Sequence, residues 1–409
     1  MIKDTDSKNS ILLLVDGLRP SMLGPYGNTW FDTTRLNQLA SESLVFEQCI
    51  SDSPDVQLGL RGILQGTHAC GQKTGEIYLP QALVENGDVA TLVTDDATKY
   101  ADYHDCFSQI IEVEVSEAGG LAVDISETQM ASFFATATET LQQMDQPGML
   151  LLDCSGFVNC WDAPYSYREE LSDPEDPTPS KSSAVPAMQF NAAADDPDQL
   201  LEYQTAYGGQ IYVFDELLRI LLAEIDQSRW ASSALFCLAS TRGFPLGEHG
   251  VVGFYRPVLY NESSQVPLII RWPISSRRLG RSHQIVQPGS LFQLFSQWHN
   301  VDIGVRSQFA QIEPDHLLAD KQNMAAVMNC QLEGANHFAI QTASWKYLAG
   351  ASRQLFVKPD DIWEYNDVAE LCQQVAEELD EQLVCAVGKL KDGGTPKFRL
   401  QDALAFGVE

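Results

Sequence analysis

The sequence predicts an α/β fold in which a mostly parallel central sheet carries helices on both faces, followed by a smaller C-terminal α+β region. Three observations support it. Short, uninterrupted apolar runs recur before residue 300, as in strands that are buried on both faces. Segments with apolar residues at steps of three or four, the spacing of amphipathic helices, alternate with these runs. After roughly Val301 the alternation ends, and hairpin-like segments take its place.

The first strand is expected at 11–15, a continuous run of Ile, Leu and Val. Asp16 and Gly17 end this run, and ligands in open α/β sheets commonly bind where strands end. A helix is expected at 33–43, with Leu36 and Leu39 on its buried face, and a long amphipathic helix at 200–225. Further strands are expected at 89–94, 148–153, 234–239 and 266–271.

The chain divides, on this pattern, into a domain of residues 1–300 and a smaller C-terminal α+β subdomain of residues 301–409. Within the first domain, 162–199 is rich in Pro and Asp and too long for a simple connection, so we expect a surface insertion or lid there. In the subdomain, 337–343 and 345–348 are typical of a hairpin, and 368–383 of an acidic amphipathic helix.

Composition narrows the classes of function. The net charge of −30 over 409 residues repels nucleic acid and anionic membranes, so neither is expected as a partner. The chain has no apolar window of 18 residues, and residues 1–10 are polar, so we expect neither a membrane span nor a signal peptide. The nine cysteines are scattered without metal-binding spacing, which predicts reduced thiols and a cytoplasmic protein.

Several stretches, in a fixed order, resemble one family. Residues 240–250 read Ser-Thr-Arg-Gly-Phe-Pro-Leu-Gly-Glu-His-Gly, and 266–273 read Val-Pro-Leu-Ile-Ile-Arg-Trp-Pro. They resemble the sulfatase pattern S-D-H-G-E-x-L-G-E-H-G followed by V-P-L-I-I-R-x-P. The opening, 11–28, is similar to that family's I-L-L-I-x-x-D-D-L-R-P-x-x-L-G-x-Y-G-N. Weaker similarities follow at 33–46, 161–164 and 339–348.

The resemblance covers most of the chain and implies an alkaline phosphatase-like fold in the alkaline phosphatase/sulfatase superfamily. It also implies hydrolysis of sulfuric or phosphoric esters. In sulfatases this chemistry uses a divalent cation, usually calcium, and a formylglycine nucleophile made from the Cys or Ser of C/S-x-P-x-R. Positively charged or imidazole side chains neutralise the sulfuryl oxygens, and an acid protonates the leaving alcohol.

This sequence departs from that pattern at its most important positions. One carboxylate of the ligand pair remains as Asp16, which we assign as the metal ligand, while Thr241 and Arg242 replace the Asp and His of S-D-H-G. The nucleophile position falls on Gln57 if the alignment is fixed at Arg61, and on Val56 if it is fixed at Gly66. Neither residue can become formylglycine.

Three further candidates remain after these losses. Arg61 and His249 are the catalytic candidates, and Arg61 and Arg242 are the candidates for binding the substrate anion. Arg242 has a second interpretation, in which its guanidinium replaces the absent cation and pairs with Asp16. Asp16 and these three residues also have structural interpretations: Asp16 as a cap, Arg61 as an ion-pair partner, His249 as a packing residue and Arg242 as a solvent-facing side chain.

The sequence therefore favours a sulfatase-like protein that is catalytically impaired and needs no cofactor. The alternative is an active ester hydrolase with a rewired site, using calcium or another divalent cation. In that case Asp55 or Thr241 would act as the nucleophile, and Asp153, Asp95 or Asp96 would supply the missing carboxylates. A phosphomutase- or phosphodiesterase-like protein is a third, less favoured interpretation. The expected partner is an anionic small molecule or a sulfated sugar.

Overall fold

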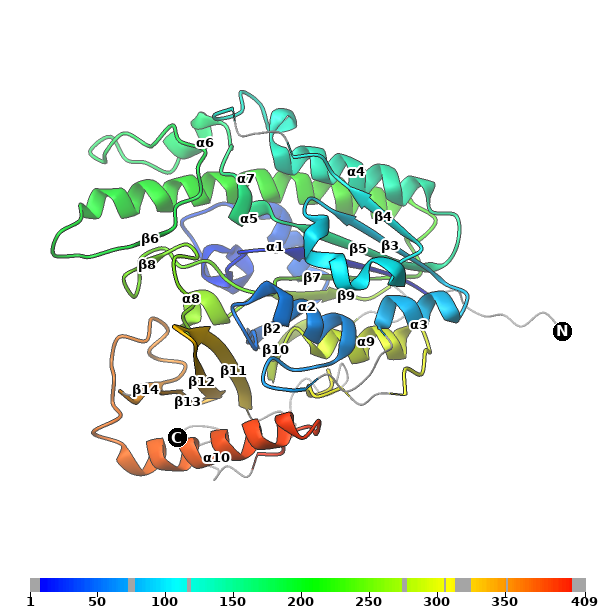
Figure 1. Cartoon of the computed structure of the whole chain (residues 1–409). Coiled ribbons are helices and arrows are strands. Elements are labelled where there is room, and N and C mark those ends of the chain that lie inside the picture. Colours follow the sequence, from blue (N-terminus) through cyan, green and yellow to red (C-terminus); the bar gives the residue numbers. More distant parts are fainter. Residues whose placement is uncertain are drawn as a thin grey trace.

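A mixed eight-stranded sheet forms the centre of the computed structural model, which describes residues 8–72, 78–115, 119–273, 278–304, 307–312, 325–350 and 352–398 (Figure 1). All neighbouring strands are parallel except β9, which runs antiparallel to both β2 and β7. The predicted fold class is therefore confirmed. In spatial order the strands are β10 (Gly280–Val286), β2 (Leu44–Cys49), β9 (Leu268–Arg271), β7 (Ala234–Ala239), β1 (Asn9–Val15), β5 (Gly148–Cys154), β3 (Val89–Thr94) and β4 (Gln109–Glu112).

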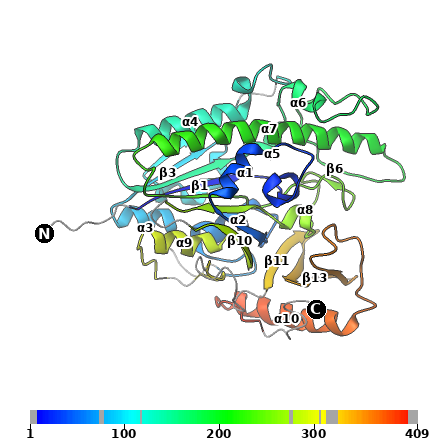
Figure 2. The same ribbon diagram turned by 180° about the vertical axis from the view of Figure 1, so that it is seen from behind.

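Helices cover both faces of this sheet because β1 sends alternate side chains into two separate cores. Ile11, Leu13 and Val15 pack with α4 (Gln129–Gln143) and α7 (Pro197–Gln227). Leu12 and Leu14 pack with α2 (Val56–Gln65), α3 (Leu79–Glu85) and α9 (Ser290–Trp298). Figures 1 and 2 show α4 and α7 on one side of the sheet and α2, α3 and α9 on the other.

The elements predicted within residues 1–300 are confirmed with small changes at their ends. The helix expected at 33–43 is α1 (Thr34–Ser41), and the one expected at 200–225 lies within α7, which begins at Pro197 behind the capping side chain of Asp196. The strand expected at 266–271 begins two residues later, as β9. Pro267 precedes it, and proline has no N–H to donate to a sheet.

A second, antiparallel sheet follows in the C-terminal part of the chain. Its strands are β11 (Ala325–Leu332), β12 (Ala335–Thr342), β13 (Trp345–Ala349) and β14 (Gln354–Val357), paired in that order. The expected hairpin corresponds to β12 and β13. The helix expected at 368–383 is instead α10 (Gln373–Lys391), because the N–H of Val368 donates to Leu355 and residues 368–372 form a turn.

The small sheet is joined to the central part of the molecule through a buried group of charges, Lys346, Lys358 and Glu364, called here the Glu364 cluster. The Glu364 carboxylate lies 3.1 Å from the Lys346 ammonium and 2.7 Å from the Lys358 ammonium. It also accepts a hydrogen bond from the backbone N–H of Asn261 at 3.0 Å. Glu364 has a left-handed backbone (φ 57°) and is buried, so these contacts hold an otherwise unfavourable conformation.

The Pro/Asp-rich insertion at 162–199 packs beside α7. It contains α6 (Tyr165–Glu169) and a short strand β6 (Met188–Gln189), which pairs with β8 (Val251–Val252). The guanidinium of Arg168 donates to the backbone carbonyls of Trp161 and Ser180 and holds the start of the insertion in place. A role as a lid stays a prediction.

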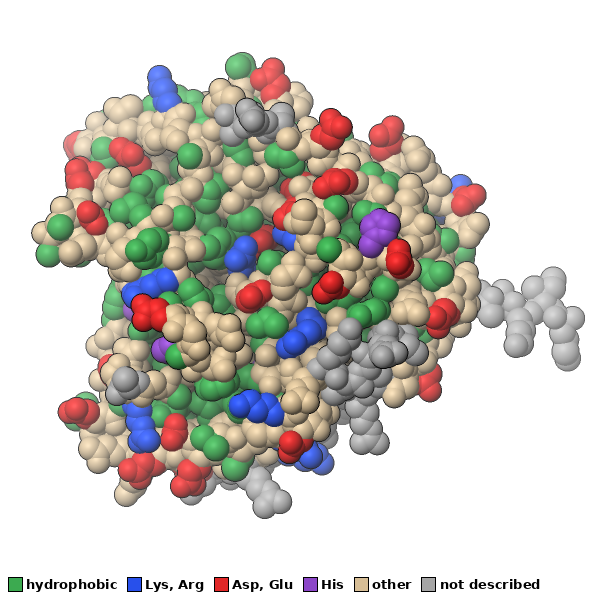
Figure 3. All heavy atoms as spheres, in the orientation of Figure 1, with side chains coloured by type: hydrophobic (Ala, Val, Ile, Leu, Met, Phe, Trp, Pro, Cys, Tyr) green, Lys and Arg blue, Asp and Glu red, His purple; other side chains and the backbone are tan. Residues whose placement is uncertain are grey.

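Composition predicts reduced cysteines and no membrane span. All nine cysteines are free, and seven of them are buried. Among the described residues, no helix is long and apolar enough to cross a membrane. The first seven residues of the polar start lie outside the described part. Figure 3 shows Asp and Glu side chains spread over one face of the molecule with Lys and Arg between them.

Candidate functional site

The candidate site lies where β1, β5 and β7 end. Leu14 of β1 is level with Asp153 of β5 on one side and with Ala239 of β7 on the other. Because the three strands are parallel, Asp16, Asp153 and the segment after Ala239 emerge at the same edge of the sheet. Asp16 and Asp153 are both buried, so their carboxylates need partners within the protein.

The principal partner of Asp16 is Arg242. Its Nε and Nη2 atoms donate to the two carboxylate oxygens of Asp16 at 2.7 Å and 2.9 Å, a two-pronged ion pair. The guanidinium also stacks 3.6 Å from the ring centre of Phe254, and its Nη1 donates to the Pro54 carbonyl at 3.4 Å. The pairing of Arg242 with Asp16, one of the two interpretations of the sequence, is therefore present.

A second cation, Lys99, completes the site. It lies on the 3-10 helix η3 (Ala97–Cys106), is buried, and places its ammonium 3.3 Å from Asp153 and 3.9 Å from Asp16. Burial alone would lower the pKa of Lys99, but Asp153 and Asp16 outweigh it and raise that pKa. Asp16, Lys99, Asp153 and Arg242 are called the Asp16 cluster below.

The other carboxylates considered as ligands have different surroundings. Asp95 accepts the backbone N–H of Ser155 at 2.9 Å, and burial raises its pKa. Asp96 caps η3 through the N–H of Thr98. Of Asp95, Asp96 and Asp153, Asp153 is therefore the one that forms an ion pair with Lys99. Lys99 in turn lies beside Asp16.

Asp153 makes the stability of the protein depend on pH. Burial raises its pKa to about 6, although Lys99 opposes this shift. Between the usual Asp pKa of about 4 and this value, the folded protein keeps a proton that the unfolded chain has lost. The stability contributed by this proton is complete below about pH 4 and is lost as the pH rises through about 6.

Replacing Asp153 with Asn should flatten this part of the pH dependence. We expect the urea midpoint of the unmodified protein to fall relative to that of Asp153→Asn between pH 4 and pH 6.5, the window set by a raised pKa of about 6. Urea unfolding of both proteins at half-unit steps checks it. Midpoints that run parallel across the window would contradict the assignment.

The N-terminus of α2 carries the two alternative nucleophile positions. Val56 is the first residue of the helix and is half-buried, whereas Gln57 is exposed. Neither side chain has a nucleophilic atom. The carboxylate of Asp55 caps the helix by accepting the N–H groups of Gln57 and Leu58, so it is engaged with its own helix.

Thr241 is buried between β7 and α2. Its carbonyl accepts the hydroxyl of Ser51 at 2.5 Å. A Cβ atom on Gly59 would lie 3.0 Å from the Cβ of Thr241, so glycine at that position allows the close approach of α2. The structure therefore gives Thr241 a packing role in this part of the site.

Arg61 and His249 are not brought into contact with Asp16. Arg61 donates to the carbonyls of His68, Ala69 and Gly71, which follow the far end of α2. His249 lies beside the Glu364 cluster: Nδ1 is 2.7 Å from a Glu262 oxygen and Nε2 is 3.2 Å from the Glu364 carbonyl. Burial lowers the pKa of His249, but Glu262 and Glu364 together raise it by more. Both residues thus have structural partners, and a catalytic role for either stays a prediction.

The residues present do not fit a divalent cation. Calcium takes about six to eight oxygen ligands, and both oxygens of Asp16 already accept hydrogen bonds from Arg242. In the ranges that the structure describes, no group of three or more His, Cys, Asp or Glu side chains is placed to hold a metal. Positive charge at this edge of the sheet comes instead from Arg242 and Lys99.

Lys99 is the site residue that the sequence did not reveal. It lies among Thr, Tyr and Ala in a stretch without a motif, and its burial is set by contacts with β5, 54 residues away. The one signal in the sequence was the pair Asp95 and Asp96 after β3, which marks a strand end rich in charge.

Comparisons with known proteins give a consistent result. The family model described as Sulfatase matches residues 8–301. Human iduronate 2-sulfatase is 24% identical over 338 residues, 66% of this chain, and the chain spans 60% of that relative's length.

Solved structures share the fold over nearly the whole chain. A protein solved in complex with its substrate D-glucosamine-2-N,6-O-disulfate has a TM-score of 0.76 at 15% identity, covering 96% of this chain and 100% of its own. The phosphonate monoester hydrolase of Agrobacterium radiobacter has a TM-score of 0.75 at 14% identity, with 92% and 95% covered. At such identities the likeness establishes the fold alone.

Proposed function

Because the chain belongs to the sulfatase family, we propose that it is a catalytically impaired member, which keeps the fold but does not hydrolyse sulfuric esters with a bound metal. One observation carries the proposal: both carboxylate oxygens of Asp16 accept hydrogen bonds from Arg242. In this proposal the guanidinium takes the electrostatic role of the cation that the family uses, and it does so permanently because it belongs to the chain.

The charge balance of the Asp16 cluster supports this reading. Two carboxylates, Asp16 and Asp153, face two cations, Arg242 and Lys99. A divalent ion would have to displace a guanidinium that also stacks on Phe254 and donates to Pro54. Arg242 and Lys99 balance Asp16 and Asp153, and the further carboxylate beside them, Asp95, accepts the backbone N–H of Ser155. The cluster therefore attracts a further cation only weakly.

The residues around the cluster also favour an impaired site. The nucleophile position falls on Val56 or Gln57, whose side chains cannot attack an ester. Arg61 and His249 are engaged with carbonyl groups and with Glu262, away from Asp16. Catalysis at this site would therefore lack the nucleophile that the family pattern supplies.

The partner that we propose is an anionic small molecule, of which a sulfated sugar is one example. Arg242 is 16% exposed and is the more accessible of the two cations, so an anion would compete with Asp16 for its guanidinium. The net charge of −30 argues against nucleic acid and anionic membranes. Nine free cysteines support a reducing location, and we propose the cytoplasm.

The alternative, an active hydrolase with a rewired site, has one observation in its favour. Asp153 and Asp16 lie within reach of the same Lys99 ammonium, at 3.3 Å and 3.9 Å, so two carboxylates do meet at the sheet edge. A metal between them would have to replace Lys99 as well as Arg242.

Metal content and turnover separate the two proposals. We expect protein purified without added metal to contain well under one equivalent of calcium, magnesium or zinc. We also expect it to show no chelator-sensitive hydrolysis of aryl sulfate or aryl phosphate. Asp16→Asn, which keeps the shape of the side chain, and Asp124→Asn, at an exposed carboxylate, serve as the matched pair. One equivalent of metal with hydrolysis lost in Asp16→Asn alone would establish the alternative.

A further inference from the structure

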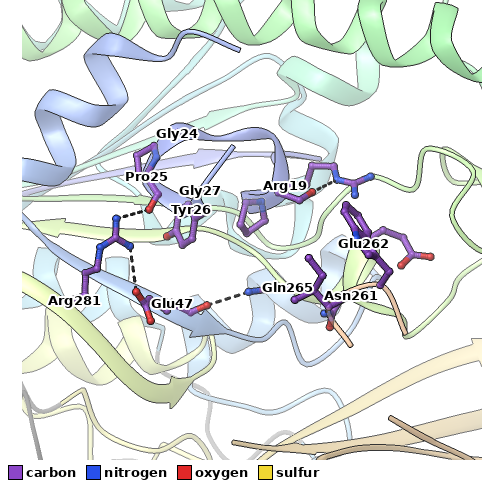
Figure 4. Close-up of a pocket in the computed structure, with 14 residues that line it drawn as sticks. Arg19, Gly24, Pro25, Tyr26, Gly27, Glu47, Asn261, Glu262, Gln265 and Arg281 are labelled. Atoms are coloured by element: carbon purple, nitrogen blue, oxygen red, sulfur yellow. Dashed lines mark hydrogen bonds and ion pairs between the residues drawn. The ribbon is translucent and has the colours of Figure 1, made fainter. Parts of the chain in front are cut away.

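A cavity of about 460 Å³ lies away from the Asp16 cluster, and no residue of that cluster lines it. It is formed by the loop after β1, by β2 and β10, and by the C-terminal segment that carries Trp363 (Figure 4). Its volume lies in the range of about 300–1,000 Å³ that is typical of small-molecule sites. Such sites often form between structural units, as this one does.

One wall of the cavity is apolar and is held in place by hydrogen bonds to Asn261. Ile362 and Trp363 are 54% and 47% exposed, respectively, and directly precede Glu364. The side-chain amide of Asn261 donates to the Ile362 carbonyl at 3.0 Å, and the Asn261 backbone N–H donates to the Glu364 carboxylate at 3.0 Å. The half-exposed indole of Trp363 is therefore carried by a segment that hydrogen bonds to Asn261 hold in place.

The charged groups that line the cavity are already paired. Arg281 lies 3.2 Å from Glu47, an ion pair that Figure 4 shows beside the hydrogen bond from Gln265 to the Glu47 carbonyl. Arg19 lies 2.5 Å from Glu248, and Glu262 lies 2.7 Å from His249. The pairs of Arg19 and Glu262 are buried, so a charged ligand would have to break a buried ion pair to reach either residue. Arg281 is half-exposed, but its guanidinium also donates to the Pro25 carbonyl at 2.6 Å. The cavity therefore favours an uncharged ligand.

Neutral polar groups of the lining keep hydrogen-bonding capacity. The Nε2 of Gln265 donates to Glu47, which leaves its amide oxygen as an acceptor. The hydroxyl of Ser21 accepts a hydrogen bond from Arg19 and has a proton of its own to donate. A half-exposed indole that lines the same cavity as these donors and acceptors suits a ring that is apolar on one side and rich in hydroxyls at its rim.

We propose that this cavity binds an uncharged sugar unit, with the sugar ring against Trp363 and its hydroxyls on Gln265 and Ser21. The site is separate from the Asp16 cluster, so this inference does not depend on whether the protein hydrolyses an ester.

Titration with three uncharged disaccharides, cellobiose, maltose and lactose, tests the proposal by ligand-observed NMR on the full chain. We expect saturable binding of at least one of them in the millimolar range, and a loss of affinity of about tenfold or more in Trp363→Ala. Leu371→Ala is the control, because Leu371 is 85% exposed and does not line the cavity. Asp16→Asn should bind as the unmodified protein does, which separates this site from the proposed function.

Three results would overturn the inference. They are the absence of saturable binding for all three sugars, binding that Trp363→Ala leaves unchanged, and a sulfated monosaccharide whose tighter binding, relative to its uncharged form, is lost in Trp363→Ala. Because Trp363 is half-exposed, the variant is expected to fold, and its urea midpoint confirms this before the titration.

Discussion

Replacing Arg242 with alanine is expected to lower the free energy of unfolding by about 3–5 kcal/mol, the usual cost of removing one partner from a buried ion pair. The Asp16 carboxylate is only 2% exposed and would lose both of its close hydrogen bonds. Its remaining cation, Lys99, is 3.9 Å away and is closer to Asp153. Urea unfolding at pH 7.5 measures the loss.

Three further variants separate the pair from its surroundings. Arg242→Lys keeps the charge without the planar fork and should lose an intermediate amount. Adding Asp16→Asn to Arg242→Ala removes the unpaired charge and should restore part of the stability. Arg219 is exposed and paired with Glu216 at 3.1 Å, so Arg219→Ala should cost less than about 1 kcal/mol. If Arg242→Ala cost no more than this control, the proposed importance of the pair would be wrong.

A calcium site is expected to appear when Thr241→Asp and Arg242→His are combined. The double change releases both oxygens of Asp16 and adds a second carboxylate where the sulfatase pattern has Asp, so that oxygen ligands for calcium become available. His at position 242 follows the same pattern and removes the positive charge of the guanidinium. At a calcium concentration of 100 times Kd, the variant should gain about 2.7 kcal/mol of stability relative to chelator, whereas the unmodified protein should gain none. Unfolding in calcium and in chelator, together with calorimetric titration, measures the difference.

Gly17 and Lys99, which lie beside Asp16, stay unchanged in this variant. Gly17 has a left-handed backbone (φ 78°), and a Cβ there would lie 2.9 Å from Val158, so restoring the second Asp of the family would strain the loop. Lys99 stays because Asp153 needs it. Thr241→Asp alone, with Arg242 still in place, is the control and should gain no calcium response. Equal stabilisation of all three proteins by calcium would contradict the idea that Arg242 excludes the metal.

Much of the fold could be predicted because the central strands are buried on both faces. Runs such as 11–15 and 148–153 are largely apolar without alternation, and such a run is the pattern that identifies a buried parallel strand in a sequence. The start of α10 was placed too early because its first expected turn is set by a hydrogen bond to Leu355, a contact that periodicity does not contain.

The candidate site was predictable only in part. The contact between Asp16 and Arg242 could be predicted because the family pattern places both positions beside one metal. Lys99 and Asp153 depend on the register between β3, β5 and β1, which the sequence does not state. The cavity beside Trp363 brings together the loop after β1, the edge strand β10 and a segment of the C-terminal part. Tertiary packing alone brings these three segments together, so the cavity could not be predicted from the sequence.

The Glu364 cluster has a consequence for how such a protein can evolve. Its two lysines and its carboxylate belong to the C-terminal part, but the carboxylate and Lys346 also hold Asn261 of the larger part. A C-terminal part acquired from a relative by recombination would have to supply the same charges at these positions to match Asn261 and His249. The two parts of the gene are therefore expected to be inherited together, and to diverge as one unit.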